Sequence, residues 1–148
     1  MRQFILVVTV SLLCACTKSP NQSVPTDLKN YRGQWLVINY WAKWCAPCIK
    51  EIPELNKLNQ ARSDLTVLGV NYDGAIGEEL ATQVKDFAIS FPMLTEDPAA
   101  FLGTSRPTVL PTTLIVSAKG ALEQTLVGPQ TFESLIAVVD LLQANSTR

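Results

Sequence analysis

The chain has 148 residues, of which 47% are hydrophobic, so it is long enough for one globular domain with its own core. Twelve Lys and Arg residues against 13 Asp and Glu residues give a net charge of −1, and no basic block marks a nucleic-acid interface. The sequence has no His, which excludes Ser-His-Asp and Cys-His nucleophiles and His-ligated zinc, copper or haem.

The N-terminal segment has the pattern of a secretory signal. Its apolar run, residues 4–15, is shorter than the about 20 residues of a transmembrane helix. The run ends in the tetrapeptide LCAC, which resembles the lipobox of bacterial lipoproteins, where a small residue precedes a Cys that is lipidated and becomes the new N-terminus. We therefore predict a lipoprotein-type signal peptide over residues 1–15 and lipidation of Cys16, with an uncleaved or soluble-secretory signal as the alternative.

Residues 16–30 are predicted to be the lipidated N-terminus and a flexible tether. They are mostly polar, contain Pro20 and Pro25 and lack a periodic apolar pattern. Two or more acyl chains on Cys16 would hold the chain stably on a membrane. The folded domain is expected over residues 31–148.

Strands and helices are predicted to alternate in the first half of this domain. The apolar, β-branched and aromatic run 35–41 predicts a strand buried on both faces, and so does the run 65–71. The apolar residues at helical spacing in 49–58 predict a helix after the first strand. A second amphipathic helix is expected through residues 80–88.

The second half is predicted to contain a β-hairpin and a final helix. The runs 113–116 and 122–127 predict the hairpin, and residues 132–142 predict the helix, with Thr131 as its N-cap. The stretch 91–109 is expected to hold only a short strand near Met93 and a short helix around residues 99–102. Parallel strands linked by helices and followed by an antiparallel edge predict an α/β fold, a mixed central sheet with helices on both faces.

Cys45 and Cys48 form a Cys-x-x-Cys motif where the first strand meets the first helix, which is the context of a redox motif. On one helical turn the two sulfurs can close a disulfide, and the positive end of the helix dipole favours the thiolate of Cys45. We predict Cys45 as the exposed attacking thiol and Cys48 as the more buried resolving thiol.

Two other interpretations of this motif are disfavoured. A zinc site would need two more ligands, and the mature chain offers only the distant Cys16 and no His. A purely stabilising disulfide would close so short a loop that it would contribute little to stability. We expect no metal and no cofactor beyond the redox-active disulfide itself.

The motif WCAPC, with the strand before it, resembles the thioredoxin superfamily. The stretches NYWAKWCAPCIKEIPEL and VLPTTLIV are similar, more narrowly, to TlpA/ResA-like membrane-anchored thiol-disulfide oxidoreductases of bacterial envelopes, over about residues 36–142. The resemblance implies a thioredoxin-like fold and disulfide exchange with protein substrates. It also implies a membrane electron donor and a periplasmic location, on the outer or the inner membrane. We expect a monomer.

The resemblance also implies roles for residues around the substrate. Pro111 stands where this family places a cis-proline facing the disulfide, which leaves the backbone of Leu110 free to pair with an extended substrate chain. Trp44, Ala46 and Pro47 are the further expected substrate-binding residues.

Glu51, three residues after Cys48, is expected to point toward the second sulfur. The family has an acidic residue at the matching place, which implies a half-buried carboxyl group with a raised pKa that moves the proton of Cys48. Asn39 occupies the strand position where cytosolic thioredoxins carry a buried Asp, so that proton carrier is replaced here.

The main functional hypothesis is an envelope disulfide reductase acting on secreted or periplasmic proteins such as apocytochrome c. A disulfide-donating oxidant is the first alternative, although oxidants of the DsbA type carry Pro-His between the cysteines and a large helical insertion. A peroxidase would need Thr or Ser in place of Ala42, and a copper chaperone would need His. A non-enzymatic lipoprotein interaction module is the remaining alternative.

Overall fold

The computed structural model describes residues 28–146; the predicted signal peptide, Cys16 and most of the predicted tether lie outside these residues. The described chain begins with a short 3-10 helix and continues through five strands and three α-helices. In chain order these are η1 (Leu28–Tyr31), β1 (Trp35–Trp41), α1 (Ala46–Ala61), β2 (Leu65–Asn71), α2 (Gly77–Asp86), β3 (Met93–Leu94), β4 (Thr112–Val116), β5 (Leu122–Val127) and α3 (Phe132–Ser146).

The strands form one mixed sheet in the order β3-β2-β1-β4-β5. β1 lies at its centre, parallel to β2 from the Trp35–Leu65 pair to the Trp41–Asn71 pair. On its other side β1 pairs with β4 in antiparallel orientation, and β4 continues into the β5 hairpin. The predicted buried strands 35–41 and 65–71 are therefore confirmed, and their apolar runs match strands that have neighbours on both sides.

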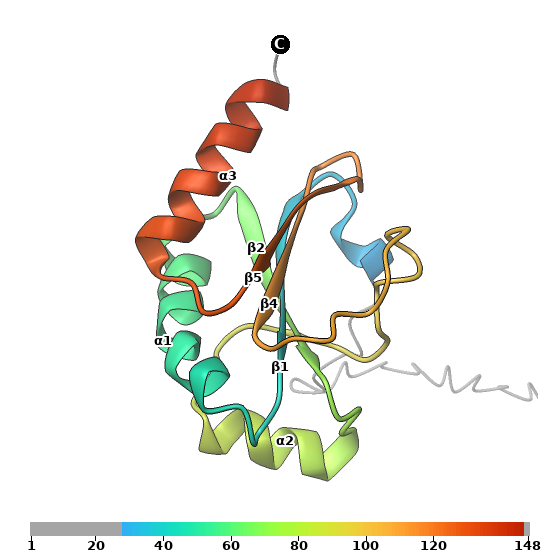
Figure 1. Ribbon diagram of the computed structural model, residues 1–148, viewed down its shortest axis with the longest axis vertical. Coiled ribbons are helices and arrows are strands. Elements are labelled where there is room, and N and C mark those ends of the chain that lie inside the picture. Colours follow the sequence, from blue (N-terminus) through green and yellow to red (C-terminus); the bar gives the residue numbers. More distant parts are fainter. Residues whose placement is uncertain (1–27, 147–148) are drawn as a thin grey trace, which may run out of the picture.

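Each face of the sheet has its own hydrophobic cluster, because successive side chains of a strand point to opposite faces. Val37 and Trp41 of β1 join the cluster that α1 and α3 cover. Leu36, Ile38 and Tyr40 join the other cluster, which η1 and the loop before β4 cover. Figure 1 shows α1 and α3 on one side of the sheet and α2 across the end where β1 finishes. The predicted α/β fold is confirmed. On the face that carries Leu36, Ile38 and Tyr40, the helical element is the 3-10 helix η1.

The segment between β3 and β4 differs from the prediction. Met93–Leu94 forms the expected short strand, but no helix forms around residues 99–102. The amide of Leu102 donates to the carbonyl of Pro98 at 3.0 Å, so one helix-like turn is present. Gly103 then has a φ of 69°, a left-handed conformation that ends a helical turn.

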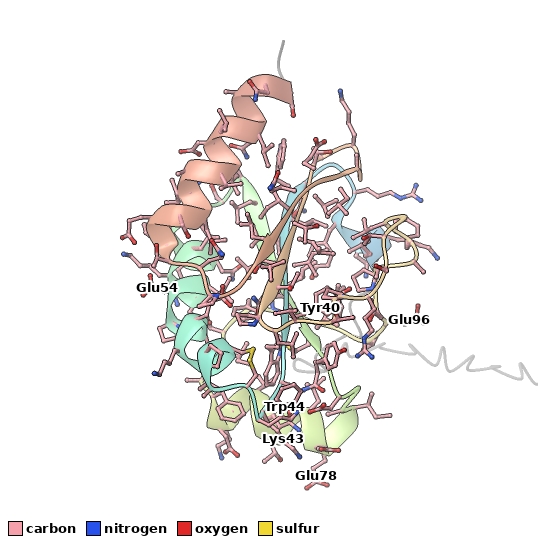
Figure 2. All side chains as sticks on the ribbon, viewed as in Figure 1. Tyr40, Lys43, Trp44, Glu54, Glu78 and Glu96 are labelled. Carbon is pink, nitrogen blue, oxygen red and sulfur yellow. A yellow bond between two sulfur atoms is a disulfide. The ribbon has the colours of Figure 1, made fainter. Side chains whose placement is uncertain are left out.

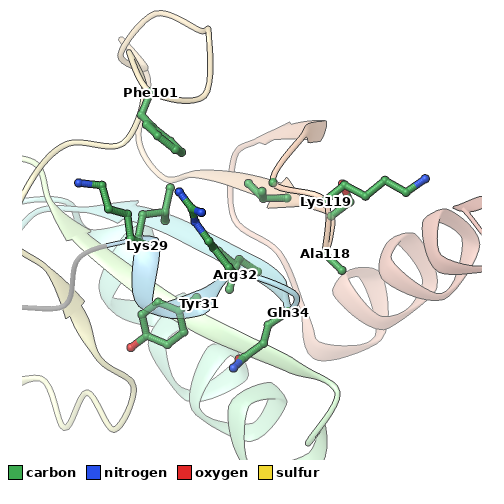
Figure 3. Close-up of a pocket in the computed structure, with 12 residues that line it drawn as sticks. Lys29, Tyr31, Arg32, Gln34, Phe101, Ala118 and Lys119 are labelled. Atoms are coloured by element: carbon green, nitrogen blue, oxygen red, sulfur yellow. The ribbon is translucent and has the colours of Figure 1, made fainter.

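The two ends of the sheet carry different surfaces. Figure 2 shows Lys43, Trp44 and Glu78 together at the end where β1 finishes. At the start of β1, a cavity lies beside η1 and the β4–β5 turn (Figure 3). None of the helices within residues 28–146 is both long and apolar enough to cross a membrane.

The packing of α1 on the sheet predicts a large stability difference between two Leu→Ala substitutions. Leu55 of α1 is fully buried, whereas Leu141 of α3 is 63% exposed. Leu55→Ala should lower the free energy of unfolding by about 2–5 kcal/mol, because it leaves a cavity in the core. Leu141→Ala should change it by less than about 0.5 kcal/mol. Urea denaturation of both variants measures this, and equal losses would contradict the packing of α1.

Candidate active site

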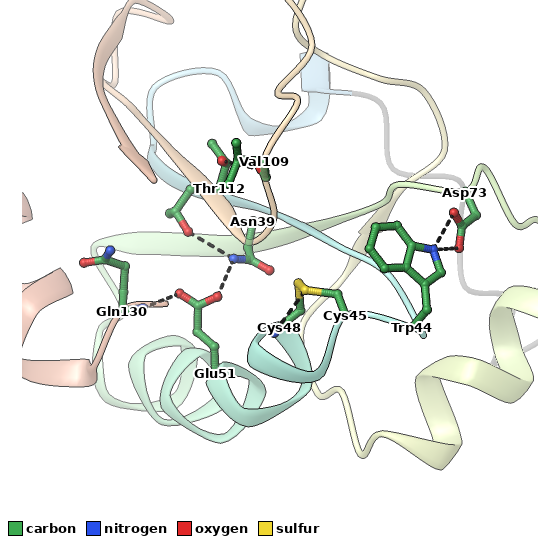
Figure 4. The surroundings of a disulfide bond; sticks show 10 residues. Asn39, Trp44, Cys45, Cys48, Glu51, Asp73, Val109, Thr112 and Gln130 are labelled. Atoms are coloured by element: carbon green, nitrogen blue, oxygen red, sulfur yellow. Dashed lines mark hydrogen bonds between the residues drawn. A yellow bond between two sulfur atoms is a disulfide. The ribbon is translucent and has the colours of Figure 1, made fainter. Parts of the chain in front are cut away.

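The two cysteines form a disulfide at the start of α1. Their Cα atoms are 5.3 Å apart, and Cys45 is the N-cap residue of the helix. The Sγ of Cys45 accepts a hydrogen bond from the backbone N–H of Cys48 at 3.3 Å (Figure 4). Pro47 fits in this first turn because its missing N–H would have no partner inside the helix. The sulfur of Cys45 thus lies where unpaired N–H groups and the helix dipole favour negative charge.

The burial of the two residues corrects one expectation. Cys48 is fully buried and Cys45 is only 4% exposed, so the order of exposure is as predicted, but Cys45 is not an exposed residue in this disulfide form. Both residues belong to the hydrophobic cluster that contains Trp41, whose packing covers them. The exposure of Cys45 is set by this tertiary packing, which the motif alone does not report.

The two tryptophans beside the motif have different environments. Trp41 is fully buried in the core, where its ring contacts the edge of Phe87. Trp44 is 63% exposed, and its indole N–H donates to both carboxylate oxygens of Asp73 at 3.0 and 3.1 Å. Its ring also meets that of Tyr72 edge-on, with centroids 6.5 Å apart. Trp44 is therefore an exposed aromatic surface held in a defined orientation.

The loop before β4 is bound to the same aromatic cluster through Arg106. The guanidinium group of Arg106 stacks over the ring of Tyr72 at 4.0 Å and donates to the Tyr72 carbonyl. It also pairs with Asp97 at 3.0 Å, and Asp97 accepts a hydrogen bond from Tyr40. Burial of Tyr40, with a smaller contribution from the hydrogen bond to Asp97, raises the pKa of Tyr40. The chain leading to Pro111 is thus fixed relative to Trp44.

Pro111 and Leu110 lie at the disulfide end of the sheet. Thr112 pairs with Tyr40 across the β1–β4 ladder, so Pro111 stands at the level where β1 runs toward the cysteines. The Leu110–Pro111 peptide bond is cis, as the resemblance implies. Leu110 packs against the cluster that contains both cysteines.

Glu51 lies on the same helix as the cysteines, one turn beyond Cys48. Its side chain is buried, and both carboxylate oxygens accept hydrogen bonds: Oε1 from the backbone N–H of Gln130 at 2.8 Å and Oε2 from Nδ2 of Asn39 at 3.0 Å. Desolvation by burial raises the pKa of Glu51 to about 7, although these two hydrogen bonds favour the ionised form and oppose the shift. The carboxyl group therefore exchanges its proton near neutral pH.

Asn39 connects Glu51 to the sheet. Its Nδ2 donates to Oγ1 of Thr113 at 3.0 Å as well as to Glu51, so both of its N–H groups are used. Its Oδ1 is buried and has no hydrogen-bond partner within residues 28–146. Figure 4 shows the Asn39 amide between the Glu51 carboxylate and the disulfide. An acceptor is thus available beside the sulfurs.

Sequence reasoning missed three contributors to this site: Thr113, Gln130 and Asp73. They come from β4, from the loop before α3 and from the loop after β2, and no local motif marks them. In residues 28–146, no group of three or more Cys, Asp or Glu side chains is placed to hold a metal ion.

A mixed sheet of this order, with a cysteine pair at the start of the helix after its central strand, defines a thioredoxin-like protein. Comparison with known proteins gives the family. The profile of the AhpC/TSA family matches residues 15–125, and the chain belongs to this family.

Two curated relatives and one solved structure illustrate the similarity. Thiol-disulfide oxidoreductase ResA of Bacillus cereus is 31% identical over 111 residues, which are 74% of this chain and 64% of ResA. Thioredoxin-like protein YneN of Bacillus subtilis is 32% identical over 78% of this chain and 69% of its own length. The chain thus spans about two thirds of the length of these relatives. A secreted thiol-disulfide isomerase from Corynebacterium glutamicum is 26% identical, with a TM-score of 0.64 over 75% of this chain and 71% of that structure.

The buried Glu51 predicts a pH dependence of stability. The unfolded chain releases this proton near pH 4.5 and the folded chain near pH 7, so between these values the folded state binds more protons. The free energy of unfolding should therefore fall as pH rises from about 4.5 to 7, by an amount on the order of 3 kcal/mol.

Denaturant titrations of the oxidised protein between about pH 4 and pH 8 measure this slope. Glu51→Gln should remove it, whatever the variant does to absolute stability. Glu78→Gln, at an exposed carboxylate of α2, is the matched control and should retain it. The same slope in the wild type and in Glu51→Gln would contradict the assignment.

Proposed function

We propose that this protein is a thiol-disulfide oxidoreductase that reduces disulfides in secreted or envelope proteins through a Cys45/Cys48 dithiol. The observation that carries the proposal is the position of Cys45 Sγ at the N-terminus of α1. There it accepts a hydrogen bond from the backbone N–H of Cys48. This position stabilises a thiolate, which is the form that attacks disulfides. The similarity to thiol-disulfide oxidoreductase ResA and to a secreted thiol-disulfide isomerase supports thiol-disulfide exchange as the activity.

The reaction begins with the reduced protein. The Cys45 thiolate attacks one sulfur of a substrate disulfide, so a mixed disulfide forms and one substrate thiolate leaves. Cys48 then loses its proton and attacks the sulfur of Cys45, which releases the second substrate thiolate and closes the Cys45–Cys48 disulfide. Two electrons pass from the protein to the substrate, and a membrane electron donor restores the dithiol.

We assign to Glu51 the role of accepting the proton of Cys48. A base with a pKa of about 7 is suited to accepting and returning a proton at neutral pH. Asn39 holds the carboxylate through Oε2, and its buried Oδ1 can accept a hydrogen bond from the Cys48 thiol once the disulfide opens. Proton transfer and sulfur chemistry would then share one buried site.

The substrate would lie along the rim formed by the cysteine motif and the loop before β4. An extended substrate chain can pair with the backbone of Leu110, as in other strand-addition complexes. Trp44, Ala46 and Pro47 are exposed beside the disulfide and offer an apolar contact for the residues flanking the substrate cysteine. Unfolded envelope proteins such as apocytochrome c fit this description.

The location belongs to the same proposal. We infer a chain on the periplasmic side of a bacterial envelope, anchored by lipid on Cys16 and acting as a monomer. The LCAC tetrapeptide supports the lipid anchor, and the secreted relative from Corynebacterium glutamicum supports the location outside the cytoplasm.

Cysteine substitutions test the activity. Cys45→Ser should abolish insulin reduction, because the attacking sulfur is lost. Cys48→Ser should also stop turnover, but it should accumulate a mixed disulfide at Cys45, which non-reducing gels and mass spectrometry detect in envelope extracts. A wild type that is inert with insulin, together with a Cys48→Ser protein that traps nothing, would favour a non-enzymatic interaction module.

The reduction potential decides the direction of electron flow. Equilibration with glutathione or dithiothreitol should give a value near that of thioredoxin, about −270 mV. A potential near that of DsbA, about −120 mV, would instead identify a protein that donates its disulfide.

A further inference from the structure

The cavity at the start of β1 is lined by basic side chains. Its volume is about 360 Å³, and its floor includes the buried side chains of Leu36 and Val116. Among residues 28–146, its charged lining residues are three cations, Lys29, Arg32 and Lys119. The cations come from η1 and from the β4–β5 turn, which the fold brings together at one end of the sheet.

Two of these cations differ from most other basic side chains of the domain. Arg32 and Lys119 are exposed, and neither forms an ion pair within residues 28–146. Four cations elsewhere are paired with carboxylates; these pairs are Lys43–Glu79, Lys57–Glu133, Arg62–Asp64 and Arg106–Asp97. The charges of Arg32 and Lys119 are therefore not neutralised by a carboxylate of the described residues and are available to an external partner.

The arrangement of the cations indicates an extended partner. Figure 3 shows the side chains of Lys29 and Lys119 pointing away from each other, with Arg32 between them, so they do not converge on one small anion. Phe101, from the loop before β4, stands on the same rim and is 65% exposed. Spread cations around an exposed aromatic ring match an interface that is anionic at its surface and apolar below it.

The opposite end of the molecule carries several carboxylates. Asp73 lies in the loop after β2, and Glu78 and Glu79 lie in the first turn of α2. Figure 2 shows Glu78 at the end of the sheet where β1 finishes. Lys43 there is paired with Glu79. The exposed cations Arg32 and Lys119 and the carboxylates Asp73 and Glu78 thus lie at opposite ends of the sheet.

The described chain also begins at the end of the sheet that carries Arg32 and Lys119. Leu28 lines the cavity, and Cys16, the predicted lipidation site, precedes it by 12 residues. A chain of this length spans at most about 40 Å. A lipid on Cys16 would therefore keep this end within reach of the leaflet.

We propose that the surface formed by Lys29, Arg32, Phe101 and Lys119, here called the basic face, docks on the headgroup layer of an anionic phospholipid leaflet. The cations contact lipid phosphates and the Phe101 ring enters the interfacial region. The carboxylates of Asp73 and Glu78 at the opposite end are not attracted to this leaflet, so the disulfide is turned toward the aqueous side, where substrates approach. This inference concerns orientation; it rests on the lipid anchor proposed above and is independent of the redox activity.

Amide hydrogen exchange of the full chain on vesicles tests the docking. The chain is reconstituted on phosphatidylcholine vesicles with or without about 30 mol% phosphatidylglycerol. Exchange in peptides covering residues 99–104 and 117–121 should slow about fivefold with phosphatidylglycerol only, and about 0.5 M salt should remove the effect. Peptides of α2 should exchange equally on both vesicles. Because an N-terminal anchor would hold the chain on both kinds of vesicle, the comparison reports orientation rather than attachment.

Charge reversal gives a matched control. Arg32→Glu with Lys119→Glu should abolish the protection, whereas Lys50→Glu with Lys85→Glu, the same charge change at exposed sites away from the basic face, should retain it. Equal exchange on the two vesicles, or loss of protection in both double variants, would overturn the proposal. Insulin reduction by the same samples is measured separately, so inactivity with intact protection would count against the proposed function alone.

Discussion

The contact on which the site depends joins the start of α1 to the sulfur of its own N-cap residue. A helix leaves its first N–H groups without partners inside the helix, and here the N–H of Cys48 donates to Sγ of Cys45. The central strand β1 places that helix start at the end of the sheet, beside the loop that leads into β4. The helix start therefore favours negative charge on the sulfur of Cys45, and β1 places this sulfur beside the loop that leads into β4.

Around this contact, a buried polar network joins four segments of the chain. Glu51 of α1 is bound by Asn39 of β1 and by the backbone of the loop before α3, and Asn39 is bound in turn by Thr113 of β4. Burying a carboxyl group is unfavourable, and these hydrogen bonds only partly offset the penalty, so the pKa of Glu51 remains raised to about 7. Because the burial penalty is only partly offset, an ionised Glu51 lowers the stability of the fold at neutral pH. For the same reason Glu51 can exchange its proton there.

The regular elements were largely predictable from local patterns. The runs 35–41 and 65–71 are apolar on both faces, which is the pattern of central strands, and the helical spacing from Ile49 to Leu58 gave α1. The segment before β4 was not predictable, because turns around Gly103 and the contacts of Arg106 with Tyr72 shape it instead of a periodic pattern. The low exposure of Cys45 was missed for the same reason, since it follows from packing against residues of other elements.

The amino-acid order alone predicted the disulfide between Cys45 and Cys48, because a cysteine pair within one helical turn after a buried strand involves only neighbouring residues. Tertiary structure alone decided which groups surround it. Gln130 and Thr113 lie 79 and 74 residues from the side chains that they contact. Likewise, Arg32, Phe101 and Lys119 meet only because η1, the loop before β4 and the β4–β5 turn gather at one end of the sheet. Such proximity depends on strand order and register, which are properties of the whole sheet and leave no signal in any single segment.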